Sequence, residues 1–164
     1  MPRSLTLVRH AKSSWADAGL TDFERPLNRR GLSNAPMMGQ RLARAGYRAD
    51  AIISSPAVRA ATTADLIAEE IGFHRSRILR KHSVYASGLA TLLEVLTQID
   101  NAHQHAMLVG HNPGVTQLCN HLCAGDLDNM PTCSIACIEF DAQSWEDAVR
   151  EKGHLAAFDY PKNT

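Results

Sequence analysis

The sequence predicts an α/β fold in which strands and helices alternate along the chain. Three short apolar runs, at residues 5–8, 51–53 and 107–110, have the length and composition of buried strands. Each run is followed by a segment in which apolar residues recur at helical spacing. This order is typical of parallel strands with helices packed on the sheet, and no repeat or low-complexity segment interrupts it.

Length and composition indicate one globular domain over residues 1–164. Hydrophobic residues make up 45% of the chain, which is enough for a sizeable core. The 17 basic and 17 acidic side chains cancel, so no net positive charge attracts nucleic acid or acidic lipid. Too few apolar residues precede Arg9 for a signal peptide, and no run approaches the roughly 18 residues of a spanning helix. We expect a cytoplasmic protein that binds neither nucleic acid nor membrane.

The first half of the chain contains a long loop and a helix. Residues 11–27 mix polar residues, glycine and proline without either period, which predicts the loop. The helix that follows ends near Gly46 and carries one apolar face. This face comprises Leu32, Ala35, Met38 and Leu42. Its start has two alternatives: Ser33 as the cap places Pro36 in the first turn, whereas a start at Asn28 predicts a kink at the proline.

A second helix follows the apolar run at residues 51–53. Ser55 is expected to cap it, Pro56 to take its first position, and Gly72 to end it. Its apolar stripe comprises Ala60, Ala64, Ile67 and Ile71. Arg59 then lies in the first turn.

The second half continues the same order. We expect a short strand at residues 77–80 and then a helix capped by Ser87, with apolar residues spaced for burial. These residues are Leu89, Leu92, Leu93, Leu96 and Ile99. After the third apolar run, Asn112 is expected to cap, and Pro113 to open, a helix that ends near Gly125. The last elements are a strand at 133–140, a helix at 145–151 and a strand at 154–158.

Four basic side chains follow the three apolar runs. They are Arg9 and His10 after the first run, Arg59 after the second, and His111 after the third. Because the carboxyl ends of parallel strands meet at one edge of a sheet, we expect these side chains to lie together in the ligand crevice there. Arg59 and His111 also lie near helix N-termini, where free N–H groups favour anions. The sequence therefore predicts an anion site.

The chemistry of these residues suits phosphate. Arg9 and Arg59 can bind the nonbridging oxygens, and His111 can add a third contact as imidazolium or as a neutral donor. His10 is then left to attack phosphorus in line and form a phosphohistidine that water cleaves. Its attacking nitrogen must carry no proton, so its other ring nitrogen needs an acceptor such as a backbone carbonyl. No metal is required, because the arginines neutralise the charge.

Metal binding is the alternative for the histidines, and zinc binding is the alternative for the cysteines. Adjacent arginines repel a cation and no carboxylate follows these strands, so we expect no metal at His10 and His111. The thiols fall in two pairs, Cys119 with Cys123 and Cys133 with Cys137. Each pair lies inside an apolar element and not on a tight turn, which favours core packing over zinc.

The long loop leaves the sheet edge that carries the predicted nucleophile, so its polar side chains can fold over a bound anion. We expect substrate contacts from Ser13 and Arg25, and from Asn112 near the other histidine. Simple solvent exposure is the expectation for Lys12 and Ser14, and it stays open for Arg25.

Four motifs carry a resemblance: LVRHAKSSW at 7–15, DFERPLNRRG at 22–31, SSPAVRA at 54–60 and VGHNPG at 109–114. Together they resemble the histidine phosphatase superfamily, and specifically its small SixA-type phosphohistidine phosphatase branch. The resemblance implies a phosphoglycerate mutase-like three-layer α/β sandwich, with a mostly parallel central sheet, helices on both faces and no inserted cap. It also implies no cofactor and catalytic roles for Arg9, His10, Arg59 and His111.

The substrate expectation depends on a missing carboxylate. Larger members of the superfamily have an acid before the third helix, whereas residues 81–86 here read KHSVYA. Protonation of an alcohol leaving group by a positioned acid is worth about 10²–10⁴-fold in rate, and a neutral imidazole departs with less help. An uncapped pocket also suits a protein-borne group. We therefore expect hydrolysis of phosphohistidine on a signalling partner, such as a phosphotransfer domain or a phosphotransfer-system carrier.

Two other functions stay open at this point. One is a phosphomonoesterase for small phosphate esters, with Asp22 or Glu24 as the acid. The other is a noncatalytic module that binds phosphorylated partners and is stabilised by zinc on its four thiols.

Overall fold

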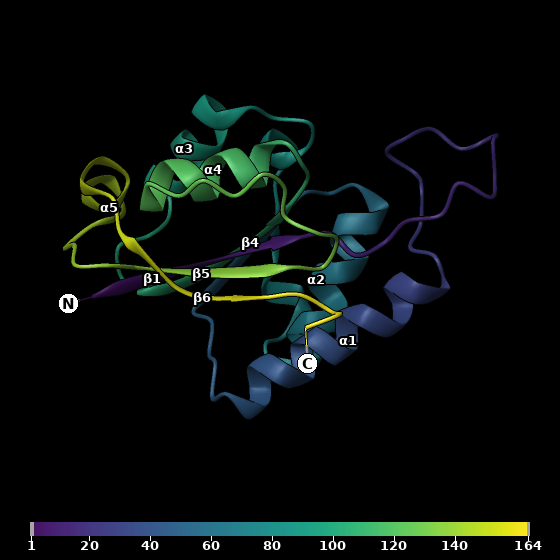
Figure 1. Ribbon diagram of the computed structural model, residues 1–164, viewed down its shortest axis with the longest axis horizontal. Helices are drawn as coiled ribbons and strands as arrows, with labels where there is room; N and C mark the ends of the chain where they lie inside the picture. The colour runs from purple at the N-terminus through teal and green to yellow at the C-terminus, as the bar shows by residue number, and fades with distance from the viewer. Residues whose placement is uncertain (1, 164) are drawn as a thin grey trace.

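The computed structural model describes residues 2–163, which form one six-stranded sheet with helices on both faces (Figure 1). The strands are β1 (Arg3–Arg9), β2 (Ala51–Ser54), β3 (Leu79–Arg80), β4 (His105–Gly110), β5 (Ile135–Phe140) and β6 (His154–Asp159). The helices are α1 (Arg29–Arg44), α2 (Val58–Ile71), α3 (Leu89–Thr97), α4 (Gly114–Cys123) and α5 (Trp145–Glu151). None of these helices combines the length and the apolar composition needed to cross a bilayer.

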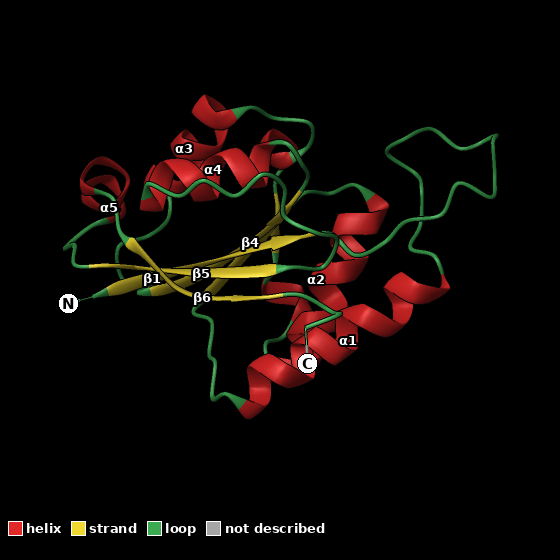
Figure 2. Cartoon of the chain, in the orientation of Figure 1, coloured by secondary structure: helices red, strands yellow, loops and turns green. Residues whose placement is uncertain are grey.

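The strand order is β3-β2-β4-β1-β5-β6. The first four strands pair in parallel, and β5 pairs antiparallel with both β1 and β6. Helices α1 and α2 cover one face of this sheet, and α3, α4 and α5 cover the other (Figure 2). The expected three-layer α/β sandwich with a mostly parallel sheet is confirmed. The strand expected at 77–80 is shorter, because residues 75–77 form a 3₁₀ turn and only 79–80 pair with β2.

Two apolar clusters hold the helices to the sheet, one on each face. Leu7 and Leu108 point to the face that α3, α4 and α5 cover, whereas Val8 and Val109 point to the face that α1 and α2 cover. Both faces of β1 and β4 are therefore buried. This explains why these strands read as continuous apolar runs and not as an apolar–polar alternation. Trp145 of α5 is 1% exposed in the first cluster.

Helix α1 starts at the earlier of its two predicted positions. The Gly31 N–H donates to the Asn28 Oδ1 at 2.9 Å, so Asn28 is the cap and the Ser33 alternative is wrong. The helix continues through Pro36. Leu32, which was expected on the buried face, is 52% exposed. The helix packs through the predicted Ala35 and Met38, and through the glycines Gly31 and Gly39.

Two predicted serine caps are wrong. Helix α2 begins two residues later than expected, with Ala57 as its cap residue, and Ser55 Oγ accepts from the Ala57 N–H at 3.1 Å. Helix α3 has Gly88 as its cap residue, and no side chain caps it, so Ser87 does not have that role. Gly72 ends α2 with a positive φ of 76°, as predicted.

The four thiols are free and are spread over two elements and a loop. Cys119 and Cys133 are buried, and burial raises the pKa of each thiol to about 12. The Cys123 thiol donates to the Cys119 carbonyl at 3.0 Å. Within residues 2–163 no three or more His, Cys, Asp or Glu side chains gather as they would around a metal ion. Cys119, Cys123 and Cys133 pack in the apolar clusters. The strand expected at 133–140 begins at Ile135, so Cys133 lies on the turn before it and not inside the strand.

The close approach of α1 to the loop after β1 gives the first prediction. A Cβ at Gly31 would lie 2.2 Å from the Lys12 carbonyl oxygen, which already accepts from the Asn28 N–H at 2.9 Å. We expect Gly31→Ala to lower the free energy of unfolding by about 1–3 kcal/mol through this overlap, as measured by urea denaturation. Gly88→Ala is the control, because its added Cβ meets no atom within 4 Å. Equal stability of the two variants would contradict the prediction.

Candidate active site

The carboxyl ends of β1, β2 and β4 meet at one edge because the three strands are parallel and in register. The register continues one residue beyond the strands. The His10 N–H donates to the Gly110 carbonyl at 3.0 Å, and the Ser55 N–H donates to the Val109 carbonyl at 3.0 Å. These bonds fix the backbone on which the predicted catalytic side chains stand.

His10 is held in one tautomer by its own backbone. Its Nδ1 lies 2.7 Å from the Ala11 carbonyl oxygen. Because a carbonyl can only accept, Nδ1 carries the proton and Nε2 carries none. Burial, together with the nearby charges of Arg59 and Arg9, lowers the pKa of His10 to about 4. The ring is therefore neutral at pH 7, with an unprotonated nitrogen, as the sequence analysis required of a nucleophile.

His111 lies beside His10, with the ring centroids 5.1 Å apart. Its Nε2 is 2.8 Å from Ser55 Oγ, an oxygen that also accepts from the Ala57 N–H. This hydrogen bond occupies Nε2, and the other ring nitrogen of His111 is Nδ1. That nitrogen is buried and has no hydrogen-bond partner within residues 2–163. Burial lowers the pKa of His111 to about 3, so of the two expected forms the neutral donor is favoured.

A cavity of about 550 Å³ opens over His10. Arg9, Arg25 and Arg59 line it together with the imidazole. The other lining residues are Lys12, Ser13, Ser14, Trp15, Ala16, Asn28 and Thr132. His111 is not part of this lining and contacts the site through the His10 ring. Three guanidinium groups around one neutral imidazole form a pocket for a multiply charged anion.

Two of the guanidinium groups are fixed by contacts with backbone carbonyls and with an aromatic ring. Arg9 Nη1 donates at 2.8 Å to a backbone carbonyl of the loop before β5. Arg25 stacks on Trp15, with 3.3 Å from its Cζ to the ring centroid, and its Nε donates to the Ser14 carbonyl at 3.2 Å. Arg25 also donates to Ser13 Oγ. The long loop therefore does fold over the anion pocket, as expected.

Asp22 connects the loop to the other guanidinium. Arg59 donates to its carboxylate at 3.0 Å and to its backbone carbonyl at 2.6 Å, and Arg25 donates to the carboxylate at 2.9 Å. Tyr85 donates to the same carboxylate at 2.7 Å. These bonds, with that of Tyr85 the largest, lower the pKa of Asp22 to about 2. Asp22 is therefore ionised at neutral pH and is unsuited to protonate a leaving group, and Glu24 is fully exposed on the loop.

Comparison with known proteins agrees with this geometry. The family described as the histidine phosphatase superfamily (branch 1) matches residues 5–81, which include His10 and Arg59. The uncharacterized chloroplastic protein At3g52155 of Arabidopsis thaliana is 30% identical over 159 residues, which cover 92% of this chain and 72% of the plant protein. The chain belongs to the histidine phosphatase superfamily.

Its structural likeness places it in the SixA-type branch. The crystal structure assigned as phosphohistidine phosphatase SixA from Agrobacterium tumefaciens aligns with a TM-score of 0.83 and 28% identity, over 98% of this chain and 99% of that one. The mitochondrial serine/threonine-protein phosphatase Pgam5 of Drosophila ananassae is 38% identical over 77 residues. Those residues cover 47% of this chain and 26% of the insect protein.

One predicted binding residue of this superfamily member lies elsewhere. Asn112 does not line the cavity. Both ends of its side-chain amide make other hydrogen bonds. Its Nδ2 donates to the Met130 carbonyl at 3.0 Å, and its Oδ1 accepts from the Thr116 hydroxyl at 2.7 Å. Helix α4 starts after Pro113, one residue later than predicted. Asn112 joins the start of this helix to the loop before β5.

Three residues of the site were missed by sequence reasoning. Trp15 and Thr132 line the cavity, and Tyr85 binds the aspartate that pairs with Arg59. Trp15 stands in one of the quoted motifs, and an aromatic residue on the same loop as Arg25 was the available signal for their stacking. Tyr85 and Thr132 lie in irregular segments with no comparable signal.

The protonation states of the two histidines can be measured directly. Since burial lowers their pKa values to about 4 and about 3, both rings should stay neutral from pH 8 down to pH 5. Nitrogen-15 NMR of the ring nitrogens should place the His10 proton on Nδ1. The unfolded chain binds these protons near pH 6.5, so stability should fall as the pH is lowered from 6.5 toward 4. A titration midpoint near 6.5 for His10 would contradict the assignment.

Asp22 competes with a bound anion for the same guanidinium groups. We expect Asp22→Asn to tighten the binding of inorganic phosphate about two- to five-fold, which is the range of a half-exposed ion pair, as measured by isothermal titration calorimetry. Asp17→Asn is the control, since Asp17 lies on the same loop and its carboxylate accepts from the backbone Gly19 N–H. Weaker phosphate binding in the Asp22 variant would show that this carboxylate chiefly positions Arg59.

Proposed function

We propose that this protein is a phosphohistidine phosphatase, which removes phosphate from histidine on a partner protein through a covalent intermediate on His10. The observation that carries the proposal is the unprotonated Nε2 of His10, set by the bond from Nδ1 to the Ala11 carbonyl. This nitrogen belongs to a cavity lined by three guanidinium groups. A neutral imidazole surrounded by positive charge is suited to attack a phosphoryl group and unsuited to bind a metal ion.

The proposed reaction has two steps. Arg9, Arg25 and Arg59 bind the nonbridging oxygens, and the neutral His111 ring beside His10 supplies a further donor. A bond forms between His10 Nε2 and phosphorus while the bond from phosphorus to the substrate nitrogen breaks, and that nitrogen keeps the electron pair and takes a proton from water. A second water then attacks phosphorus, the bond to Nε2 breaks, and inorganic phosphate leaves. The guanidinium groups neutralise the charge throughout, so we expect no metal requirement.

The choice of substrate follows from the protonation of the carboxylates. Asp22 is ionised and bound by Arg59 and Arg25, and residues 81–86 hold no acid. An alkyl ester therefore finds no positioned proton donor among these groups, whereas an imidazole leaving group needs little help. The structural similarity to the protein assigned as SixA supports the same substrate class. We expect the partner to be a phosphotransfer domain or a phosphotransfer carrier of a signalling system.

Trapping the intermediate tests the proposal. After incubation with a labelled phosphohistidine protein and an alkaline quench, we expect mass spectrometry to locate an acid-labile phosphate on His10. His10→Ala should lose more than about 10³-fold in kcat/KM, because no other group can replace the attacking nitrogen. His74→Ala is the control, since this histidine is exposed on the turn after α2.

Two outcomes would overturn the proposal. Retained hydrolysis in His10→Ala, or label on a serine or cysteine, would remove His10 from the nucleophile role. Faster turnover of an alkyl phosphate such as glycerol phosphate than of the phosphohistidine protein would favour the phosphomonoesterase. Binding of the phosphorylated partner without hydrolysis would favour the noncatalytic module.

A further inference from the structure

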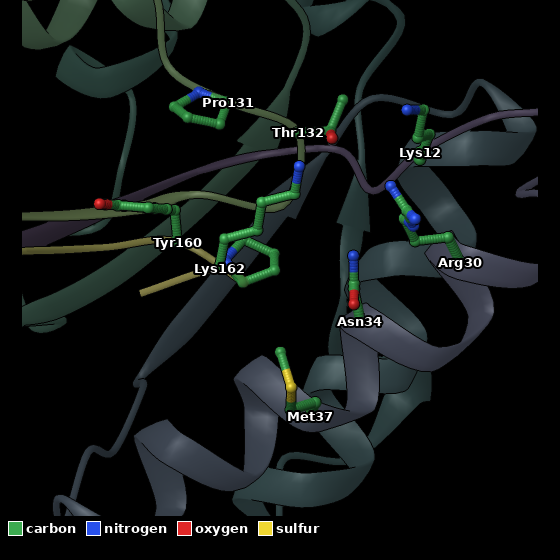
Figure 3. A pocket seen from close by; sticks show the side chains of 9 residues that line it. Lys12, Arg30, Asn34, Met37, Pro131, Thr132, Tyr160 and Lys162 are labelled. Carbon is green, nitrogen blue, oxygen red and sulfur yellow. The ribbon is translucent and has the colours of Figure 1, made fainter. Parts of the chain in front are cut away.

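A second cavity adjoins the catalytic one, on the side formed by α1 and the chain after β6 (Figure 3). It has a volume of about 520 Å³. Lys12 and Thr132 line both cavities, so a ligand in one reaches the wall of the other. We call this second cavity the basic cleft.

The walls of the basic cleft are fixed by hydrogen bonds and helix packing. On one side, the first half of α1 presents Asn34 and Met37. On the other side, residues 160–162 are held against the same helix by Arg41. The Arg41 guanidinium donates to the Asp159 carboxylate and to the carbonyls of residues 160 and 161, each at 3.1 Å. The cleft is therefore a built feature of the surface.

Its charge is positive and uncompensated. Lys12, Arg30 and Lys162 line it, and no Asp or Glu does. Within residues 2–163 none of these three cations lies within 4.0 Å of a carboxylate oxygen. Figure 3 shows Arg30 directed toward Lys12, and Lys162 directed toward the wall shared with the catalytic cavity. The first turn of α1 also carries no acidic residue, so its dipole adds to the positive potential.

The remaining surface of the cleft is apolar. Met37, Pro131, Tyr160 and Pro161 supply it. The volume far exceeds that of one phosphate group and suits several side chains of an extended segment. Since the chain has a formal net charge of zero, attraction of a partner depends on local patches such as this one.

We propose that the basic cleft docks an acidic segment of the partner protein, next to the histidine whose phosphate enters the catalytic cavity. This proposal rests on the proposed function and adds a specificity rule to it: phosphohistidine flanked by Asp and Glu is the preferred substrate. The three cations take the carboxylates, and the apolar wall takes the side chains between them.

Two chemically phosphorylated peptides test the rule. Both carry one phosphohistidine, flanked on each side by Asp and Glu in one peptide and by Asn and Gln in the other. The wild-type protein should hydrolyse the acidic peptide with about tenfold higher kcat/KM, since each exposed ion pair contributes about two- to five-fold. In Arg30→Glu/Lys162→Glu this preference should disappear, while turnover of phosphoimidazole, which cannot reach the cleft, stays unchanged.

Arg44→Glu/Lys152→Glu is the matched control. It makes the same change in charge at exposed positions outside the cleft lining, with Arg44 on the last turn of α1. This control should keep the tenfold preference. Lys12 is left intact in all variants because it also lines the catalytic cavity.

Three outcomes would overturn the docking proposal: equal turnover of the two peptides by the wild type, an unchanged preference in the cleft variant, or an equal loss in the control. A fall in phosphoimidazole turnover in the cleft variant would also overturn it, because the cleft would then act on the phosphate itself. If the wild type hydrolyses neither peptide, the proposed function fails, and the docking proposal is then tested by a binding measurement alone. Fluorescence anisotropy with the unphosphorylated acidic peptide must then show weaker binding to the cleft variant than to the wild type.

Discussion

The site depends on the register of three parallel strands. β1, β4 and β2 end at the same level, and hydrogen bonds beyond their ends tie His10 to β4 and Ser55 to the same strand. A slip of one residue would turn every side chain of a strand to the opposite face, which would expose the apolar clusters and withdraw His10 from its pocket. The packing that stabilises the sheet therefore also sets the geometry of the catalytic groups.

The charge of the two imidazoles depends on burial and on the neighbouring charges, whereas the position of a ring proton depends on hydrogen bonds. Burial keeps both imidazoles neutral, and the charges of Arg59 and Arg9 add to the effect. The Ala11 carbonyl then decides which nitrogen of His10 carries the proton. Without a bound anion, Asp22 offsets part of the positive charge. The pocket is therefore preorganised for a dianion. The group that a bound anion would displace from the guanidinium groups is the Asp22 carboxylate and not the His10 ring.

Sequence reasoning reached the elements and the reactive residues because these follow from periodicity and from strand ends. Arg9, His10, Arg59 and Arg25 do meet in one cavity. The wrong helix caps concern polar residues that have more than one possible partner. A serine or an asparagine before an apolar run is a good cap in isolation, yet Ser55 is used by an imidazole instead. Such competition is decided by tertiary contacts, which local spacing does not contain.

Burial of the thiols affects how the site responds to oxidants. The N–H of Cys133 donates to the carbonyls of both Arg9 and His10 at 3.0 Å, so this cysteine supports the backbone of the catalytic edge. With a pKa of about 12, roughly one molecule in 10⁵ carries the thiolate at pH 7, and peroxide reacts with thiolates. A phosphatase that uses the proposed ring-nitrogen nucleophile, with the thiol of Cys133 protonated, is expected to keep working under oxidative stress that silences enzymes with a cysteine nucleophile.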